Sequence, residues 1–470
     1  MKKNLKMIAV IVVIILIFSF VVFYSLSKSS SSYHLVGFDS DEAYIDMEYL
    51  TGLGPRVPGT GEDLEGAEYV KSRFSEAGLA DVHIEEYTIT TFEVNSASLS
   101  LIIVEFGSQV YTNYVHIEDF ILYQYSGSTN GDLFLEIVDV GNGSEENFEG
   151  LDMQGKAVLS TRQALPRAVE HGAMAVIVQN DRIGEELGYP PYCGGLYGSD
   201  ENGDNIPYPD ANPSAVIPTC SVSGPVGEEI RDAIENARES PILGYGTVWV
   251  QMNFATTIEE NKIYNVVGDI KGRENPEDMI YLVAHRDTTY INPGAVDNTV
   301  GTVTIMEMAR QLSNYDVDKT IRFISVDAEE EGLLGATEYV KAHEDEVKEQ
   351  GIICMNFDMN DVNLDRVDTL EVSISKLAYQ NKLKEIKAMM FDSYPELQER
   401  YKVNITEGDG GPDAAPFFKR GIDASFAIGE WGSSWEYHTQ WDTIEHVNKE
   451  SWQLSGILFG TLALDIAGVQ

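Results

Sequence analysis

Three short, largely apolar runs in the second half of the chain constrain the fold most strongly. They span Met279 to Ala284, Ile321 to Val326 and Ile352 to Phe357, and their length is typical of buried strands. Segments with apolar residues at helical spacing, Gly301 to Leu312 and Leu333 to His343, alternate with them. Strands buried between helices predict the α/β class, with a mixed, largely parallel central sheet flanked by helices.

Acidic and imidazole side chains follow each predicted strand. They are His285 and Asp287 after the first strand, Asp327, Glu329 and Glu330 after the second, and Asp358 after the third. A loop from Gly294 to Asn298 adds Asp297, and His438 stands near Asp442. Ligands of such sheets bind beyond the carboxyl ends of the strands, so these groups are expected to converge. Because so many carboxylates would repel one another, a cation is the simplest explanation, and His with Asp and Glu favours zinc or another borderline divalent ion.

The first part of the chain has a helical pattern from Phe38 to about Tyr87. Ser40 is predicted to cap a helix that begins at Asp41 and ends at the glycine- and proline-containing segment after it. A second helix is predicted from apolar residues at helical spacing, and it ends at a glycine; these residues are Leu64, Ala67, Val70, Phe74 and Gly78. Val82 to Ile89 then has the pattern of a strand.

The pattern changes between about Tyr111 and Thr257. Short β-like runs alternate with Gly and Pro clusters, and one Ala-rich helix is predicted around Arg167 to Gly172. Gly188 to Pro213 is predicted to be a long loop. These features indicate an inserted, β-rich domain.

The N-terminal region carries an apolar stretch from Met7 to Leu26 without a charged residue. Its 20 residues are enough for a helix to cross a hydrocarbon core of about 30 Å. Because Lys2, Lys3 and Lys6 precede it, the positive-inside rule predicts a single-pass membrane anchor with the rest of the chain outside the cytoplasm. A cleaved signal peptide is the alternative. The serines from Ser29 to Ser32 are predicted to form a short stalk.

Charge and cysteine content limit the kinds of partner and the disulfides that this chain can have. Asp and Glu number 76 against 32 Lys and Arg, and the resulting net charge of −44 disfavours nucleic acid as a partner. Cys193, Cys220 and Cys354 are too few for a disulfide scaffold, although Cys193 and Cys220 could pair. The oligomeric state does not follow from these numbers.

Five motifs occur in one order along the chain: His285 to Asp287, Gly294 to Asn298, Glu329 to Gly335, Asn356 to Met359, and Tyr437 to Thr439. With these motifs the chain resembles the co-catalytic di-zinc aminopeptidase family, which includes glutamate carboxypeptidase-like enzymes. Leu53 to Gly59 is similar to the opening segment of that family. Leu151 to Leu159, followed by His171 to Ile177, is similar to the protease-associated domain inserted in one of its branches.

The resemblance implies five metal ligands for two zinc ions per chain, with Asp297 bridging the ions. His285 and Asp358 would complete one site, and Glu330 and His438 would complete the other.

The resemblance also implies three catalytic roles. Glu329 would be the general base. Asp287 would accept the second N–H of His285 and so select its tautomer. Tyr437 would donate a hydrogen bond to the tetrahedral oxyanion.

Fold, domains and activity follow from the same resemblance. It implies a zinc exopeptidase fold, which would follow the N-terminal transmembrane helix that the apolar stretch predicts. Residues 1–32 would form the cytoplasmic stub, anchor and stalk, residues 33–110 and 258–470 the two parts of the peptidase domain, and residues 111–257 the inserted protease-associated domain. The implied function is an aminopeptidase that hydrolyses N-terminal residues from peptides with a metal-activated water and a Glu base.

Two alternatives remain open from the sequence. A glutamate carboxypeptidase-like activity would need basic residues to bind the terminal carboxylate of the substrate, and Arg286 and Arg420 are the nearby candidates. A non-catalytic ectodomain of the same fold would not need the ligand set, which this chain retains. Pro412-Asp413-Ala414 departs from the family's usual Ser-Asp-His and leaves the role of Asp413 open.

Overall fold

The computed structural model describes residues 35–105, 108–162, 164–239, 247–429 and 436–469, and the unit Val36–Gln470 contains every element discussed below. The predicted membrane-spanning stretch, Met7 to Leu26, lies outside the described residues. Within the described ranges, no helix is both long enough and apolar enough to cross a membrane.

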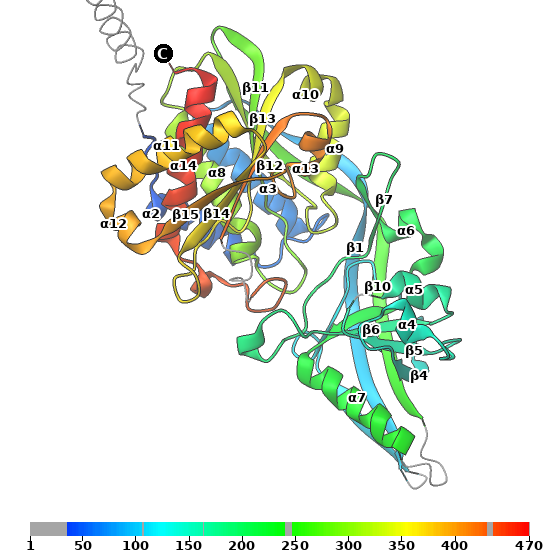
Figure 1. The fold of residues 1–470 in the computed structure, drawn as a ribbon. Helices are drawn as coiled ribbons and strands as arrows, with labels where there is room; N and C mark the ends of the chain where they lie inside the picture. The colour runs from blue at the N-terminus through cyan, green and yellow to red at the C-terminus, as the bar shows by residue number, and fades with distance from the viewer. Residues whose placement is uncertain (1–34, 106–107, 163, 240–246, 430–435, 470) are drawn as a thin grey trace, which may run out of the picture. The chain divides into compact units, whose positions relative to one another are not determined.

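The central sheet has the strand order β15-β14-β16-β13-β11-β12-β10 (Figure 1). Strands β11, β12, β13 and β16 run parallel to one another, whereas β10 is antiparallel to β12 and β14 is antiparallel to β16. Their bounds are β10 Val248–Ile270, β11 Asn275–His285, β12 Lys319–Val326, β13 Gly351–Phe357, β14 Thr369–Ile374, β15 Lys402–Glu407 and β16 Asp423–Gly429. This arrangement confirms the predicted mixed, largely parallel sheet.

Helices cover both faces of this sheet. On one face α8 and α14 contact β11 and β12, and α2 and α3 pack beside α8. On the other face alternate residues of β11, Met279, Tyr281 and Val283, share a buried cluster with residues of α9, α10 and α13. The bounds are α2 Ser40–Gly52, α3 Gly61–Glu76, α8 Val300–Leu312, α9 Leu334–Ala342, α10 Glu344–Gln350, α11 Leu377–Ser393, α12 Pro395–Arg400, α13 Ala415–Lys419 and α14 Trp452–Ala467.

The first two helices differ from the prediction in their details. Helix α2 begins at Ser40, and its cap is Asp39, whose carboxylate accepts the N–H groups of Asp41 and Glu42 at 3.1 and 3.3 Å. The prediction that Ser40 caps this helix is therefore wrong. In α3 the predicted apolar face is buried except for Leu64, which is 38% exposed. Asp63 is fully buried instead, because its carboxylate pairs with Arg286.

Two strands are much longer than the sequence pattern indicates. The predicted strand from Val82 to Ile89 is only the start of β1, which spans Ala80–Glu105 and pairs antiparallel with β10 from Ala80 to Ile103. The proposed boundary between residues 257 and 258 falls inside β10. The β1–β10 ribbon therefore continues from the central sheet into the segment 111–257.

The segment 111–257 is itself an α/β structure. Strands β4, β5, β6 and β9 run parallel, and β4 continues the sheet from β10. The sequence analysis missed the 16-residue helix α7, and the predicted loop from Gly188 to Pro213 contains β7, β8 and α6. The bounds are β2 Ser108–Tyr114, β3 Phe120–Leu122, β4 Leu133–Asp139, α4 Glu145–Phe148, β5 Ala157–Ser160, α5 Leu165–Glu170, β6 Ala175–Gln179, β7 Tyr197–Ser199, β8 Asn205–Pro207, α6 Tyr208–Ala211, β9 Thr219–Val222 and α7 Gly224–Glu239.

All three cysteines lie in the described part of the chain. Cys193, Cys220 and Cys354 are buried, and none forms a disulfide. The pairing of Cys193 with Cys220 that the sequence left open is not formed in this structure.

The cap of α2 can be tested by substitution. Asp39→Ala removes the acceptor for two N–H groups and is expected to lower the free energy of unfolding by about 1 kcal/mol in chemical denaturation. Ser40→Ala is the matched control, with an expected change below about 0.5 kcal/mol. A larger loss in Ser40→Ala than in Asp39→Ala would contradict the assignment.

Candidate metal centre

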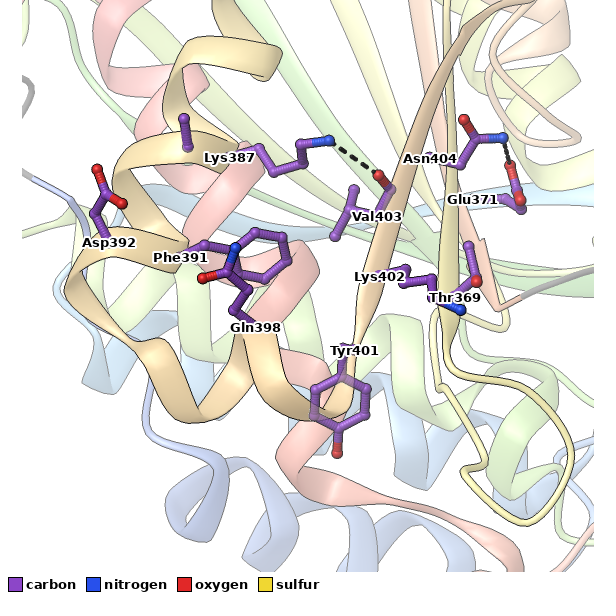
Figure 2. A pocket seen from close by; sticks show the side chains of 11 residues that line it. Thr369, Glu371, Lys387, Phe391, Asp392, Gln398, Tyr401, Lys402, Val403 and Asn404 are labelled. Carbon is purple, nitrogen blue, oxygen red and sulfur yellow. Dashed lines mark hydrogen bonds between the residues drawn. The ribbon is translucent and has the colours of Figure 1, made fainter.

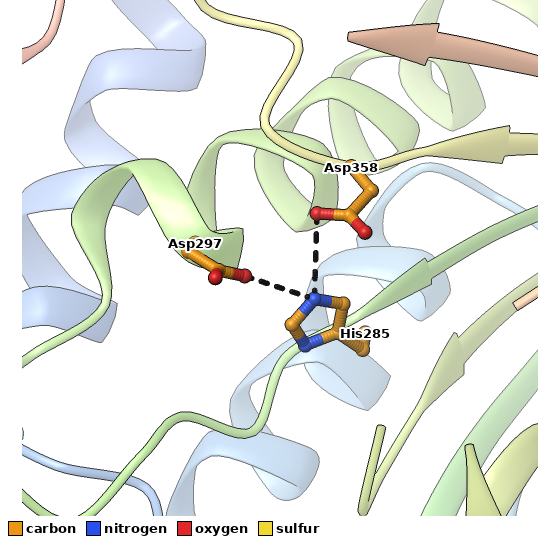
Figure 3. A group of neighbouring side chains, drawn as sticks. All are labelled: His285, Asp297 and Asp358. Atoms are coloured by element: carbon orange, nitrogen blue, oxygen red, sulfur yellow. Dashed lines mark ion pairs between the residues drawn. The ribbon is translucent and has the colours of Figure 1, made fainter. Parts of the chain in front are cut away.

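The predicted site residues converge at the carboxyl edge of the parallel strands. His285 is the last residue of β11, and Asp358 follows β13. Asp297 lies in the segment Ala295–Thr299 just before α8, where its backbone is non-helical (φ −116°, ψ 92°). Figure 3 shows the side chains of His285, Asp297 and Asp358 pointing toward one another. Glu330 follows β12, and His438 lies in a turn far along the chain, yet both meet Asp297 in a second group.

Two groups of three ligand atoms share one carboxylate. Nε2 of His285 lies 3.3 Å from Oδ1 of Asp297 and 3.5 Å from Oδ1 of Asp358. Nε2 of His438 lies 3.3 Å from Oδ2 of Asp297 and 2.9 Å from Oε2 of Glu330. Each oxygen of Asp297 thus faces a different histidine, which is the geometry of a carboxylate between two cations.

The first group contains buried polar atoms that have no hydrogen-bond partner and that a metal ion would bind. Nε2 of His285 and Oδ1 of Asp358 are buried and form no hydrogen bond, although they lie 3.5 Å apart. A buried polar atom without a partner costs free energy, so natural proteins seldom leave one. Imidazole nitrogens and carboxylate oxygens without a thiolate are the donors that zinc accepts in catalytic sites. The residues present therefore fit zinc.

The charges of the cluster also favour a bound cation. Burial opposes protonation of His285 and His438, but the surrounding carboxylates outweigh it and raise the pKa of both imidazoles well above the usual value. Burial, together with Asp297, raises the pKa of Glu330 to about 7 against the opposing effect of His438. In the absence of a cation, the carboxylates thus favour protonation of the imidazoles, and a divalent cation would take the place of these protons.

Asp287 ties the end of β11 to the turn that carries the glutamates. Its carboxylate oxygens accept the backbone N–H groups of Glu329 and Glu330, each at 3.1 Å. Nδ1 of His285 lies 3.2 Å from the main-chain oxygen of Asp287 and 3.5 Å from its carboxylate. Nδ1 of His285 therefore has two acceptors on Asp287, its main-chain oxygen and its carboxylate, and both favour the tautomer in which Nδ1 carries the proton.

Glu329 and Tyr437 lie beside the ligands. The Glu329 side chain is 15% exposed and that of Glu330 only 2%, so Glu329 is the glutamate that faces incoming molecules. The Tyr437 ring stacks on His438 with centroids 3.7 Å apart. Burial and the nearby carboxylates of Asp297 and Glu330 raise the pKa of Tyr437 well above its usual value, so its hydroxyl remains a hydrogen-bond donor.

Two further carboxylates belong to this region. Asp442 accepts the N–H groups of Val296 and Asp297 at 2.7 and 3.0 Å, so it positions the shared ligand. Asp413 is fully buried, and neither of its oxygens has a hydrogen-bond partner. Burial and the nearby Asp358 raise the pKa of Asp413 to about 8 although His285 opposes the shift. The sequence signals were weak here: Asp442 was only noted as a neighbour of His438, and the Asp413 motif departs from the family pattern.

The two arginines considered as anion-binding residues are both engaged with buried acids. Arg286 is fully buried and pairs with Asp63 at 2.7 Å and Asp327 at 3.1 Å. Arg420 pairs with Asp204 at 3.0 Å, and its side chain is 7% exposed. Arg286 is therefore a structural residue behind the site, and Arg420 already has a carboxylate partner.

A cavity of about 760 Å³ lies elsewhere, between α11, α12 and the strands β14 and β15 (Figure 2). Its polar groups bind one another: Lys387 donates to the main-chain oxygen of Val403, and Asn404 donates to Glu371. None of its lining residues belongs to the two ligand groups. The metal centre is thus the candidate functional site.

The role of Asp442 can be tested through metal affinity. Asp442→Ala leaves two N–H groups beside Asp297 without an acceptor and is expected to weaken zinc binding by about 10–100-fold in a competition titration. Asp442→Asn keeps one acceptor oxygen and should have an intermediate effect. Glu445→Ala, an exposed acid in the same loop, is the control. Unchanged zinc affinity in Asp442→Ala would show that other contacts position Asp297.

Comparisons with known proteins show which peptidases this chain resembles. Residues 265–462 match the family model described as Peptidase family M28. The chain is 27% identical over 452 residues to aminopeptidase YwaD of Bacillus subtilis, covering 91% of this chain and 85% of that protein. It is 25% identical to the glutamate carboxypeptidase 2 homolog of Caenorhabditis elegans, with coverage of 83% of this chain and 62% of that protein.

Solved structures share the fold. BSAP, a zinc aminopeptidase from Bacillus subtilis, superposes with a TM-score of 0.69 at 24% identity and covers 93% of this chain and 97% of its own. A peptidase M28 precursor from Shewanella amazonensis has a TM-score of 0.69 at 19% identity, with coverage of 90% and 92%. The match to peptidase family M28 spans residues 265–462, and this range contains both ligand groups.

Proposed function

We propose that this protein is a zinc-dependent aminopeptidase that holds two zinc ions and removes N-terminal residues from peptides. The observation that carries the proposal is the pair of three-residue ligand groups that share the Asp297 carboxylate. His285 and Asp358 would hold one ion with Asp297, and Glu330 and His438 would hold the other. The similarity to aminopeptidase YwaD over 91% of the chain supports the same activity.

The residues of the chain divide the chemistry between them. Bound zinc would polarise the scissile carbonyl and lower the pKa of a water molecule. Glu329 accepts a proton from that water as its oxygen attacks the carbonyl carbon, and Tyr437 donates a hydrogen bond to the oxygen that becomes negative. Glu329 then gives the proton to the leaving amine as the C–N bond breaks. Asp287 holds the backbone of Glu329 in place throughout.

The carboxylate-rich centre favours substrates with a free N-terminal amine. A carboxypeptidase would need a cationic side chain for the substrate carboxylate, and both sequence candidates, Arg286 and Arg420, pair with acids of the protein. A non-catalytic ectodomain would have no need of a partly accessible Glu329 beside two groups of potential metal ligands. The aminopeptidase is thus the better proposal.

We also propose the domain organisation and location that the sequence indicates. Residues 1–32 would anchor the protein in a membrane, and the catalytic part would lie outside the cytoplasm; the uncharged stretch from Met7 to Leu26 behind three lysines supports this. Residues 33–110 and 258–470 would form the peptidase domain and residues 111–257 a protease-associated domain, which would cover the cleft and favour short peptides.

The choice between the two ends of the substrate has a direct test. The chain is incubated with matched free and N-acetylated peptides, with and without a chelator. We expect chelator-sensitive release of the N-terminal residue, at least about 100-fold slower from acetylated peptides, because a site built for the amine rejects its blocked analogue. Equal release from both peptides would favour the carboxypeptidase, and no release with zinc present would favour a binding module.

The general base can be separated from the ligands. Glu329→Gln is expected to lower kcat by about 10²–10⁴-fold while the zinc content stays unchanged, since it removes the proton acceptor and not a ligand. Glu338→Gln in α9, whose carboxylate pairs with Lys341 away from the ligands, is the control. Loss of zinc from Glu329→Gln would mean that the roles of Glu329 and Glu330 are exchanged.

A further inference from the structure

A hairpin from the inserted segment reaches the second ligand group. It spans residues 193–207 and contains the antiparallel strands β7 and β8. The main-chain N–H of Cys193 donates to the main-chain oxygen of His438 at 2.8 Å. The main-chain oxygen of Cys193 lies 2.7 Å from Nδ1 of the same histidine. Because a carbonyl oxygen only accepts, Nδ1 carries the proton and Nε2 remains available toward Asp297 and Glu330.

Tyr197 of the same hairpin contacts the other ligand of this group. Its hydroxyl donates to the main-chain oxygen of Glu330 and also lies 2.7 Å from the Gln124 side chain. A methyl group on Gly195 would overlap that hydroxyl, and one on Gly332 would come within 3.1 Å of the Tyr197 ring. The ring therefore lies against the turn that carries Glu329 and Glu330 and leaves little room for the turn to move.

The far end of the hairpin is anchored to the peptidase part. Asp204, whose side chain is fully buried, pairs with Arg420 at 3.0 Å and with Lys419 at 3.2 Å, at the end of α13. By contrast, among the described residues no hydrogen bond joins the hairpin to His285 or Asp358 of the first group. The insert thus supports one ligand group and not the other.

We propose that Tyr197 and the Cys193 carbonyl are positioning groups for the second zinc ion, so that zinc affinity at Asp297, Glu330 and His438 depends on the docking of the hairpin. The inference rests on the proposed two-zinc function. Hydrogen bonds to ligands hold them in the orientation that the metal requires, and their loss weakens metal binding by about 10–100-fold. The inserted segment is then part of the metal centre in addition to any role as a cover.

The test is a zinc titration of the full-length chain, stripped of metal, in competition with a chromophoric chelator. Tyr197→Phe keeps the ring and removes the hydroxyl. We expect one of two zinc equivalents to bind about 10–100-fold more weakly, while the other keeps its affinity. Cobalt substitution should show an altered visible spectrum for the weakened equivalent only. Tyr192→Phe is the matched control, because its hydroxyl bonds Tyr123 in the same segment and no ligand.

A second variant covers the case in which Tyr197→Phe does not fold. Asp204→Asn keeps the Tyr197 side chain but weakens the ion pairs of Asp204 with Lys419 and Arg420. It is expected to lower the affinity for the same zinc ion. Wild-type affinity for both equivalents in Tyr197→Phe, or equal weakening in Tyr192→Phe, would overturn the inference and leave the proposed function intact. A wild-type chain that binds fewer than two zinc ions would overturn the proposed function and this inference with it.

Discussion

The shared carboxylate of Asp297 is the group on which the rest of the site depends. Its two oxygens face His285 and His438, each at 3.3 Å, and its backbone is held by Asp442. Three more acidic ligand or base residues, Glu329, Glu330 and Asp358, gather around the two imidazoles. Burying so many like charges is unfavourable unless cations or protons balance them, and this requirement explains both the raised pKa values and the fit to zinc.

Two buried arginines connect the elements that carry this cluster. Arg286 pairs with Asp63 and Asp327, which joins α3 to the ends of β11 and β12. Arg56, in the opening segment of the chain, donates to the main-chain oxygens of Arg286 and Pro293 and to the hydroxyl of Thr299. The loop that carries Asp297 is therefore fastened to a segment more than two hundred residues earlier in the chain. Positive charge placed there also lowers the cost of burying the acids in front of it.

Residues of the segment 111–257 contact the same ligands and the same turn as residues of the central sheet. The main chain of Cys193 exchanges two hydrogen bonds with His438, and Tyr197 contacts the backbone of Glu330. Tyr125, from the same segment, donates to the buried carboxylate of Glu331 at 2.9 Å. The turn after β12 is consequently held from two sides, by Asp287 of the peptidase part and by tyrosines of the insert. The N–H groups of Glu329 and Glu330, the main-chain oxygen of Glu330 and the carboxylate of Glu331 all have partners, which limits the movement of the turn that carries the proposed general base.

The sequence alone predicted the α/β class, the largely parallel sheet and the residues that meet at the carboxyl ends of its strands, because apolar periodicity and the residues that follow each strand are local properties of the chain. It did not reveal that Asp39 caps α2, that Leu64 is exposed while Asp63 is buried, or that β1 and β10 form one long ribbon. Those features, together with the burial of Asp413 and the contacts of Tyr197 and Arg286, are seen only in the folded structure. Tyr197 and Glu330 lie far apart in the chain, as do Arg286 and Asp63, and no local pattern encodes the distance between such residues. The Asp39 cap is local, but Asp and Ser are both favoured at N-caps, so residue type alone did not distinguish the two neighbours.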